Sequence, residues 1–321
     1  MFLKGRILSV LILAVLFIFA ADQAVFCQEE KPKEIKKIAL VLGGGGARGA
    51  AHVGVLKVME KNGIKPDIIV GNSMGAIVGG MYCAGVPLDE IEELIRKGEV
   101  QEAFKPVPIP IQFFKKLYQK IKFWERNNLP GLYSGAALEK FIRKTIPEGS
   151  HEIENLSPRF AATAVDLIDG NAYRIEKGDL SKALRASASF PPLLKPVKID
   201  KHIFTDGGVR SNVPTYAALG MDADYVIAVN VDEKVEKIDE SQISTYTELI
   251  KRLSSIIVYL RDKELLKKAD LIIQPDVEGI SIVSVRKEDY KRAIAAGEAA
   301  TLELLPALKK VFRERHKIAS Q

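Results

Sequence analysis

A serine flanked by glycines is the side chain in this sequence best suited to act as a nucleophile. The apolar run Ile68 to Val70 leads into Gly71-Asn72-Ser73-Met74-Gly75, and small residues follow as far as Gly80. This G-x-S-x-G pattern is typical of a nucleophile elbow, a strand-to-helix turn so tight that any Cβ at the glycine positions would collide across it. The helix that begins beside Ser73 would also direct its N–H groups toward a reacting oxygen. Taken alone, the pattern also fits an ordinary tight turn.

A glycine-rich loop earlier in the chain suits the same chemistry. A buried strand is expected at Ile38 to Leu42, followed by Gly43-Gly44-Gly45-Gly46-Ala47-Arg48-Gly49 and by an amphipathic helix from Ala50 to Asn62. Consecutive N–H groups without side chains can approach a developing oxyanion, and each such donor typically stabilises a transition state by about 3 to 4 kcal/mol. Because both loops would follow parallel strands, we expect them at the same edge of a sheet.

Nucleotide binding is an alternative interpretation of the glycine loop. Gly44, Gly46 and Gly49 satisfy the G-x-G-x-x-G pattern of dinucleotide-binding folds. In such a fold an acidic residue closes the second strand and binds the ribose, whereas here that strand ends on Asn72 and Ser73. No lysine followed by serine or threonine completes a P-loop either. The nucleotide interpretation therefore fits poorly.

A general base for the serine is harder to find. The usual order of an α/β-hydrolase requires a histidine in a loop near the carboxyl end of the folded region, and none is convincingly placed there. The four histidines are His52, His151, His202 and His316. A short strand that begins at His202 ends instead on Asp206-Gly207-Gly208, which on its own is a turn signal.

Three of these motifs together resemble those of the patatin-like phospholipases. Gly44 to Gly49, Gly71 to Gly75 and Asp206 to Gly208 occur in the order and approximate spacing of that family, and Ala183 to Pro191 is also similar. The chain looks like a bacterial member, and the resemblance covers about Ile38 to Val231. It implies a three-layer α/β/α fold with a mostly parallel central sheet, and a Ser-Asp catalytic dyad without a histidine that acts on acyl esters of lipids.

The resemblance also implies roles for individual residues. Ser73 would be the nucleophile, Asp206 the proton acceptor, and Gly44, Gly45 and Gly46 the oxyanion hole. The residues implied to support these motifs are Arg48, Gly49, Gly71, Gly75, Gly207 and Gly208. Whether the arginine is structural or faces a headgroup is left open by the sequence.

The proposed chemistry is physically reasonable without the family name. An aspartate with a pKa near 4 is a weak base, but burial raises a carboxylate pKa, and the serine hydroxyl becomes acidic as its oxygen attacks a carbonyl. The same Asp206 would then activate the water that releases the acyl group from Ser73. This route needs no organic cofactor, and since no compact cluster of His, Cys and carboxylate residues has ligand spacing, no metal is expected.

The amino terminus predicts export. Lys4 and Arg6 precede an apolar run from Ile7 to Ala21 that is short for a membrane span, so residues 1–27 are expected to be a signal peptide, with an uncleaved anchor as the alternative. Cys27 lies in a sequence that only loosely matches a lipoprotein box, and its lipidation is left open. Residues 28–37 are expected to be a linker. The expected location is the periplasm, the outer membrane or the medium.

Composition agrees with a large globular domain. The 321 residues are 47% hydrophobic, and the net charge of +6 suits an anionic surface as a partner. No nucleic-acid-binding motif is present, so no nucleic-acid partner is expected. The expected partners are a lipid or phospholipid substrate and a membrane surface, and the oligomeric state is left open.

A basic aromatic segment between the elbow and the aspartate is the candidate for membrane contact. Within residues 113–126, large apolar side chains at helical spacing are interleaved with lysines, which is typical of an interfacial helix. The proposed contacts are Phe114, Leu117, Ile121 and Trp124. Flanking prolines also suit a lid that moves over the site. The alternative is a helix that caps the core and never meets lipid.

The last part of the chain is expected to be a mainly helical extension packed on the core. Residues 38–231 form the predicted patatin-like domain and 232–321 the extension. Apolar residues between Ile243 and Leu265 predict a long amphipathic helix, Ala269 to Gln274 a strand, and Lys287 to Val311 one closing helix.

The function predicted from the sequence is that of a serine lipid acyl hydrolase. Two alternatives from other classes are an exported nucleotide-binding protein and a catalytically inert lipid-binding relative. The inert alternative is weakened because both Ser73 and Asp206 are present. Acyl chain length, headgroup and positional specificity are left open.

Overall fold

The computed structural model describes residues 35–104, 129, 131–191 and 193–319. The predicted signal peptide at 1–27 and most of the predicted linker lie outside the described residues. So do the four predicted membrane-contact residues, Phe114, Leu117, Ile121 and Trp124. Among the described helices, none combines the length and apolar character needed to cross a membrane.

The described strands form one eight-stranded sheet. Its hydrogen-bonded order is β5-β6-β3-β2-β1-β7-β8, with β4 also paired to β3. The strands are β1 (Ile38–Leu42), β2 (Ile68–Asn72), β3 (Arg159–Asp166), β4 (Ala172–Ile175), β5 (Val197–Ile199), β6 (His202–Asp206), β7 (Tyr225–Val229) and β8 (Leu271–Ile273). The pairs β1–β2, β1–β7, β2–β3 and β7–β8 are parallel, and those of β3–β4, β3–β6 and β5–β6 are antiparallel. The predicted mostly parallel central sheet is confirmed.

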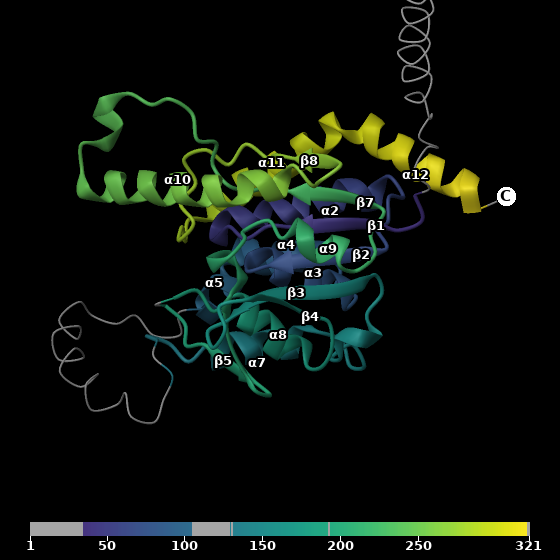
Figure 1. Cartoon of the computed structure of the whole chain (residues 1–321), viewed down its shortest axis with the longest axis horizontal. Helices are drawn as coiled ribbons and strands as arrows, with labels where there is room; N and C mark the ends of the chain where they lie inside the picture. The colour runs from purple at the N-terminus through teal and green to yellow at the C-terminus, as the bar shows by residue number, and fades with distance from the viewer. Residues whose placement is uncertain (1–34, 105–128, 130, 192, 320–321) are drawn as a thin grey trace, which may run out of the picture. The chain divides into compact units, whose positions relative to one another are not determined.

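Helices cover both faces of this sheet (Figure 1). Alternate residues of β1 point to opposite faces, so Leu40 joins one apolar core and Val41 the other. Most helical residues of the larger core belong to α2 (Ala51–Lys61), α3 (Met74–Cys83), α4 (Leu88–Lys97), α7 (Ala136–Thr145), α8 (Leu180–Ser187) and α11 (Lys287–Glu303). The smaller core is covered by α9 (Thr215–Leu219) and the last turn of α10 (Tyr246–Leu266). This is the predicted three-layer α/β/α arrangement.

The remaining helical elements are short or terminal. They are η1 (Gly46–Ala50), α5 (Glu99–Phe104), η2 (Ile153–Asn155), η3 (Gly207–Val209), η4 (Glu240–Ile243) and α12 (Leu305–Ala319). The single closing helix predicted from Lys287 to Val311 was wrong, because the chain breaks at Leu304 into α11 and α12. Pro306 accounts for the break, since its ring lacks an N–H and would clash with the carbonyl group four residues earlier in a continuous helix.

β3 is the strand that brings the two predicted catalytic residues together. β4 pairs with residues 162–165 on one edge of β3. On its other edge, Asn72 at the end of β2 pairs with Thr163, and Asp206 at the end of β6 pairs with Ala164. β2 is parallel to β3 and β6 is antiparallel, so the two strands approach each other end to end. Their carboxyl ends therefore meet at one point on β3.

Residues after 231 contribute directly to this fold. β8 extends the main sheet by pairing with β7, and α11 packs closely on α2. That helix contact depends on two glycines, because a Cβ on Gly54 would collide with the carbonyl oxygen of Ile294, and one on Gly297 with that of Ala51. The carboxyl-terminal part is therefore packed against the same core as the residues before it.

Candidate active site

Ser73 occupies a strained turn between β2 and α3. Its backbone angles are φ 51° and ψ −120°, a conformation that non-glycine residues rarely adopt. The flanking glycines are required by space, since a Cβ on Gly71 would collide with the backbone of Ala76, and one on Gly75 with the carbonyl oxygen of Leu42. The turn thus has the geometry of a nucleophile elbow.

Two polar side chains hold Ser73 in place. Its backbone N–H donates to the Oγ of Ser187, which is buried at the end of α8, at 3.0 Å. Its hydroxyl lies close enough to the carboxylate of Asp206 to lower the pKa of that carboxyl group. The serine and the aspartate are 133 positions apart in the sequence, and the end-to-end meeting of β2 and β6 brings them into contact.

Asp206 is buried among mainly neutral groups. Burial raises the pKa of its carboxyl group from 3.8 to about 6, although Ser73, Gly208, Asn72 and the positive charge of Arg261 oppose this increase. The Gly208 N–H donates to Asp206 Oδ1 at 2.7 Å. The pKa of Asp206 therefore lies just below neutral pH, where a carboxylate remains ionised but becomes a stronger base.

The two glycines after Asp206 are needed for close packing. A Cβ on Gly207 would collide with Oδ1 of Asn72, and one on Gly208 would lie 2.9 Å from Asp206 Oδ1. The carbonyl oxygen of Gly208 accepts a hydrogen bond from Arg261 near the carboxyl end of α10. The Asp-Gly-Gly turn is therefore held between β2 and α10.

The three predicted oxyanion-hole glycines differ in what their N–H groups do. The N–H of Gly44 donates to the carbonyl oxygen of Asn212 at 2.9 Å and is not available to a ligand. The N–H groups of Gly45 and Gly46 have no acceptor among the residues that the structure describes. Gly46 has a φ of +54°, and a Cβ there would collide with the carbonyl oxygen of Ile282. Two of the three predicted donors therefore have no hydrogen-bond partner among the described residues.

Asn212 connects the glycine loop to the rest of the site. Its Nδ2 donates at 2.9 Å to the carbonyl oxygen of Gly44 and to the carboxylate of Asp232. Its backbone N–H donates to the carboxylate of Asp262 on α10 at 2.9 Å, and its Oδ1 accepts from Nδ2 of Asn72 at 3.4 Å. Burial raises the pKa of Asp232 to about 6. Asn212 therefore ties together the loop, the elbow and α10.

The Arg48 side chain bonds to other groups of the protein. Its side chain is buried, with Nε donating to the carbonyl oxygen of Ile280 at 2.6 Å and an ion pair to Glu233 at 2.8 Å. Burial lowers the pKa of Arg48, while Glu233 and Asp232 raise it. Of the two roles left open by the sequence, this geometry is that of a structural residue. The neighbouring Gly49 is also structural, because a Cβ there would lie 2.7 Å from Met74 Cβ.

The family of this chain follows from its motifs and their match to known proteins. The family model described as patatin-like phospholipase matches residues 40–219, which is more than half of the chain. The chain belongs to the patatin-like phospholipase family. The predicted family and fold class are confirmed.

Relatives of this patatin-like chain are longer proteins. An uncharacterized NTE family protein of Mycobacterium tuberculosis is 30% identical over 196 residues, which are 61% of this chain and 49% of that protein. Human patatin-like phospholipase domain-containing protein 6 is 32% identical over 214 residues, which are 65% of this chain and 14% of that protein. The chain thus spans about half the length, or less, of these curated relatives.

Solved structures show a weaker likeness. VipD from Legionella pneumophila is 16% identical, with a TM-score of 0.47 over 85% of this chain and 67% of VipD. A likeness at this TM-score supports no conclusion about the patatin-like chain beyond what its own sheet and motifs show.

Neither His52 nor His202 replaces Asp206 as a partner of Ser73. His202 Nδ1 lies 2.6 Å from Asp166 Oδ2, and four residues of β6 place it about 13 Å from Asp206. His52 is fully buried and donates from Nε2 to the carbonyl oxygen of Gly43 at 2.7 Å, and burial lowers its pKa to about 4. His52 is therefore neutral and supports the glycine loop.

Sequence reasoning missed several side chains of this patatin-like site. The most important are Asn72, Thr163, Ser187, Asn212 and Arg261. Asn72 lies within the recognised G-x-S-x-G motif, and Ser187 within the similar stretch from Ala183 to Pro191. Arg261 had no local signal, because it belongs to an amphipathic helix whose other charges look like an ordinary solvated face.

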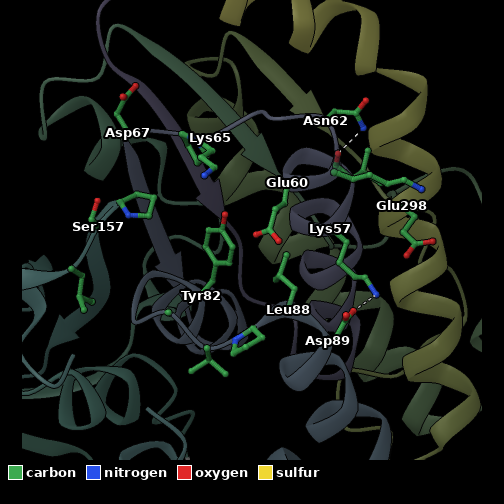
Figure 2. Close-up of a pocket in the computed structure, with 18 of the residues that line it drawn as sticks. Lys57, Glu60, Asn62, Lys65, Asp67, Tyr82, Leu88, Asp89, Ser157 and Glu298 are labelled. Atoms are coloured by element: carbon green, nitrogen blue, oxygen red, sulfur yellow. Dashed lines mark hydrogen bonds and ion pairs between the residues drawn. The ribbon is translucent and has the colours of Figure 1, made fainter. Parts of the chain in front are cut away.

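A large pocket lies far from these residues. Its volume is about 1330 Å³, and it is lined by residues at the amino ends of the parallel strands, including Asp67 before β2 and Arg159 at the start of β3. Figure 2 shows Lys57, Tyr82 and Glu298 around it, with Lys57 paired to Asp89. The pocket includes neither Ser73 nor Asp206. Among the described residues, no cluster of three or more His, Cys, Asp or Glu side chains is arranged to hold a metal.

Proposed function

We propose that this protein hydrolyses acyl esters of phospholipids or related lipids with Ser73 as the nucleophile and Asp206 as its base. The observation that carries the proposal is the meeting of β2 and β6, which brings the Ser73 hydroxyl beside a buried carboxylate whose pKa is raised to about 6. Membership of the patatin-like phospholipase family supports a lipid ester as the substrate.

In the first step, Asp206 accepts the hydroxyl proton while Ser73 Oγ attacks the ester carbonyl carbon. The negative charge that develops on the carbonyl oxygen needs preorganised donors, and the open N–H groups of Gly45 and Gly46 suit this role. The N–H of Gly44 instead keeps the loop in place through Asn212. Collapse of the intermediate breaks the ester bond, and the alcohol leaves with the proton from Asp206.

In the second step, Asp206 removes a proton from water, and the resulting hydroxide attacks the acyl group on Ser73. The acid is released and the serine recovers its proton. The strained backbone of Ser73 supports this two-step route, because the turn keeps the oxygen clear of the chain in both steps. The steps require only groups of this chain and water.

Cell location and membrane contact are separate proposals. The apolar amino-terminal run supports export, and the aromatic and basic residues of 113–126 support contact with a lipid surface. Export is tested by fractionating cells, and a cytoplasmic pool of uncleaved full-length chain would contradict it.

The main test is hydrolysis of phospholipid vesicles, with the products identified by mass spectrometry. Ser73→Ala should abolish release of free fatty acid, whereas Ser134→Ala, which changes an exposed serine on another loop, should retain it. A fluorophosphonate probe should label the native chain and the Ser134→Ala variant, but not Ser73→Ala. Undiminished hydrolysis by Ser73→Ala would refute the proposal, and an inactive, unlabelled native chain that still binds the vesicles would favour an inert lipid-binding protein.

A further inference from the structure

The carboxyl-terminal turns of α10 are fixed against the protein. Leu266 packs on the smaller core, and the hydroxyl of Thr215 in α9 donates to the carbonyl oxygen of Leu265 at 2.7 Å. Two neighbouring charged residues come just before this anchor. They are Arg261, whose side chain is 24% exposed, and Asp262, whose side chain is 2% exposed. Both lie outside the part of the chain that matches the family model.

Arg261 contacts the turn that follows the proposed base. Its Nη1 donates to the carbonyl oxygen of Gly208 and, at 3.3 Å, to that of Val209. Gly208 is also the residue whose N–H donates to the carboxylate of Asp206. The peptide groups on the two sides of Gly208 are therefore held by different partners, one by Asp206 and the other by Arg261.

Asp262 acts on the glycine loop through Asn212. Its two carboxylate oxygens accept from the backbone N–H of Asn212, at 2.9 and 3.1 Å. The side chain of Asn212 donates to the carbonyl oxygen of Gly44, and its own carbonyl oxygen accepts from the N–H of Gly44, both at 2.9 Å. Gly44 immediately precedes Gly45 and Gly46, so the position of their N–H groups depends on Asn212 and, through it, on Asp262.

We propose that Arg261 and Asp262 are positioning residues for the base and for the oxyanion donors of this site. Arg261 orients the turn beside Asp206, Asp262 orients Asn212, and the ion pair between the two, 3.3 Å from Nε to Oδ1, couples both contacts. The inference rests on the proposed function, because it assigns both residues to the same site. Catalytic groups must be held within about 0.5 Å of their productive geometry, and side chains on a helix anchored to the core suit this task.

The charge of Arg261 gives it an effect that a purely structural residue would lack. Burial raises the pKa of Asp206, and the positive charge of Arg261 is one of the effects that oppose this increase. Other described charged groups in this part of the site are Asp232, Glu233, Arg48, Asp262 and the exposed Arg210. All of them are kept when Arg261 alone is replaced, so a changed pH profile would report the loss of its charge.

The role of Arg261 is tested by measuring kcat, KM and their pH dependence on a soluble short-chain ester with the full chain. Arg261→Gln should lower kcat about tenfold and raise the pH of half-maximal kcat/KM by about half a unit, because glutamine can donate a hydrogen bond but carries no charge. Arg261→Lys keeps the charge but not the forked donor, so it should lower kcat several-fold and leave the pH midpoint native.

Arg252→Gln is the matched control on the same helix. Arg252 also donates to a backbone carbonyl oxygen, that of Glu236 at 2.6 Å, but it lies about 14 Å before Arg261 along the helix axis. This variant loses the same charge and the same kind of hydrogen bond. It should keep the native kcat and the native pH midpoint.

Asp262→Asn separates the second contact from the first. The amide retains one acceptor for the Asn212 N–H but loses the ion pair with Arg261. It should lower kcat several-fold with little change in KM, because oxyanion donors act mainly in the transition state. It should not raise the pH midpoint, since the positive charge of Arg261 remains.

Hydrogen exchange measured by mass spectrometry tests the same contacts without any need for hydrolysis. Amides of residues 207–213 should exchange several-fold faster in Arg261→Gln and Asp262→Asn than in Arg252→Gln or the native chain. Unchanged exchange would overturn the inference even in an active enzyme, whereas an inactive native chain with the expected exchange would refute the proposed function alone.

The kinetic results can also overturn the inference. A native kcat together with a native pH midpoint in Arg261→Gln would do so, as would equal changes in Arg252→Gln. Should Arg261→Gln fail to fold, which circular dichroism would show, Arg261→Lys decides, because a native kcat in that variant would exclude a positioning role.

Discussion

Two buried aspartates on neighbouring strands differ in the groups that surround them. Asp166 ends β3 and Asp206 ends β6, and each side chain is only 3% exposed. Burial raises the pKa of both, but hydrogen bonds from His202 and from the N–H groups of Ile168 and Ile203 lower that of Asp166 overall. Around Asp206 burial outweighs its neutral donors and the charge of Arg261, and its pKa is raised to about 6.

The two carboxylates differ in depth as well as in partners, since Asp166 is covered but lies near the surface of the protein and Asp206 lies deep inside it. Asp166 is stabilised as an anion by an imidazole and two N–H groups, so it has little tendency to take a proton. The partners of Asp206 offset less of the effect of burial on its pKa. One of these partners is the Ser73 hydroxyl, from which Asp206 would take a proton. The two aspartates should therefore respond differently to the same substitution.

The largest expected difference is in activity. Asp206→Asn should lower kcat/KM for a phospholipid or a short-chain ester by about a thousandfold or more, because an amide cannot accept the serine proton. Asp166→Asn, at a position with the same solvent exposure, should change kcat/KM by no more than a few-fold. Steady-state kinetics on both variants, with circular dichroism to check folding, tests this. A large loss in Asp166→Asn with the fold intact would remove the distinction.

The stability of the two variants should change in opposite directions at pH 8. The folded pKa of Asp206 is raised, so its contribution to stability is fully present below about pH 4 and is lost as the pH rises through 6. A shift of about two units corresponds to about 3 kcal/mol, so Asp206→Asn should raise the free energy of unfolding at pH 8 by up to that amount.

The folded pKa of Asp166 is lowered, so its contribution is present above the unfolded pKa of 3.8 and is lost as the pH falls through the folded value. Asp166→Asn should therefore lower the free energy of unfolding at pH 8. Urea unfolding at pH 8, at pH 4 and at a lower pH measures both effects: that of Asp206→Asn should have nearly vanished at pH 4, whereas that of Asp166→Asn should shrink only below about pH 3.8. Shifts of the same sign at pH 8 would contradict the comparison.

Asn72→Ala should destabilise the ionised form of the Asp206 carboxyl group. The substitution removes a donor to the Asp206 carboxylate, so the pKa of Asp206 should rise further and activity at pH 7 should fall about tenfold. Thr163→Val is the matched control, because Thr163 donates to Asn72 Oδ1 at 3.1 Å and does not contact the carboxylate. Equal losses in the two variants would indicate a general packing defect.

An effect of similar size is expected in the pH dependence of the native chain. With the pKa of Asp206 at about 6, kcat/KM should increase about tenfold between pH 5 and pH 7 and then level off. His202→Asn and Asp232→Asn should leave this increase in place, and Asp232→Asn is the sharper control because burial also raises the pKa of Asp232 to about 6. Disappearance of the increase in either control would assign it to that residue instead.

The sequence by itself determined the elements whose requirements are local. Ser73 lies on the predicted elbow because Gly71 and Gly75 meet steric demands within a few residues of it, and the strand patterns correctly placed β1, β2 and β6. The position of Asp206 came from the resemblance, since Asp-Gly-Gly alone predicts only a turn. The break before α12 had a local signal in Pro306 that the apolar periodicity obscured.

Only the tertiary structure decided which polar groups bond to other parts of the protein and which remain available. The Gly44 N–H is taken by Asn212, 168 residues away, and Arg48 is buried against residues that follow the predicted domain. Exposed apolar side chains of α10, such as Leu253 and Ile257, have the spacing expected on a helix that faces a core. The sequence therefore predicted an amphipathic helix, but not that these side chains are exposed. Periodicity and turn chemistry act over a few residues. Hydrogen-bond partners and solvent exposure depend on how distant segments meet, here on the single edge of β3 where β2 and β6 end.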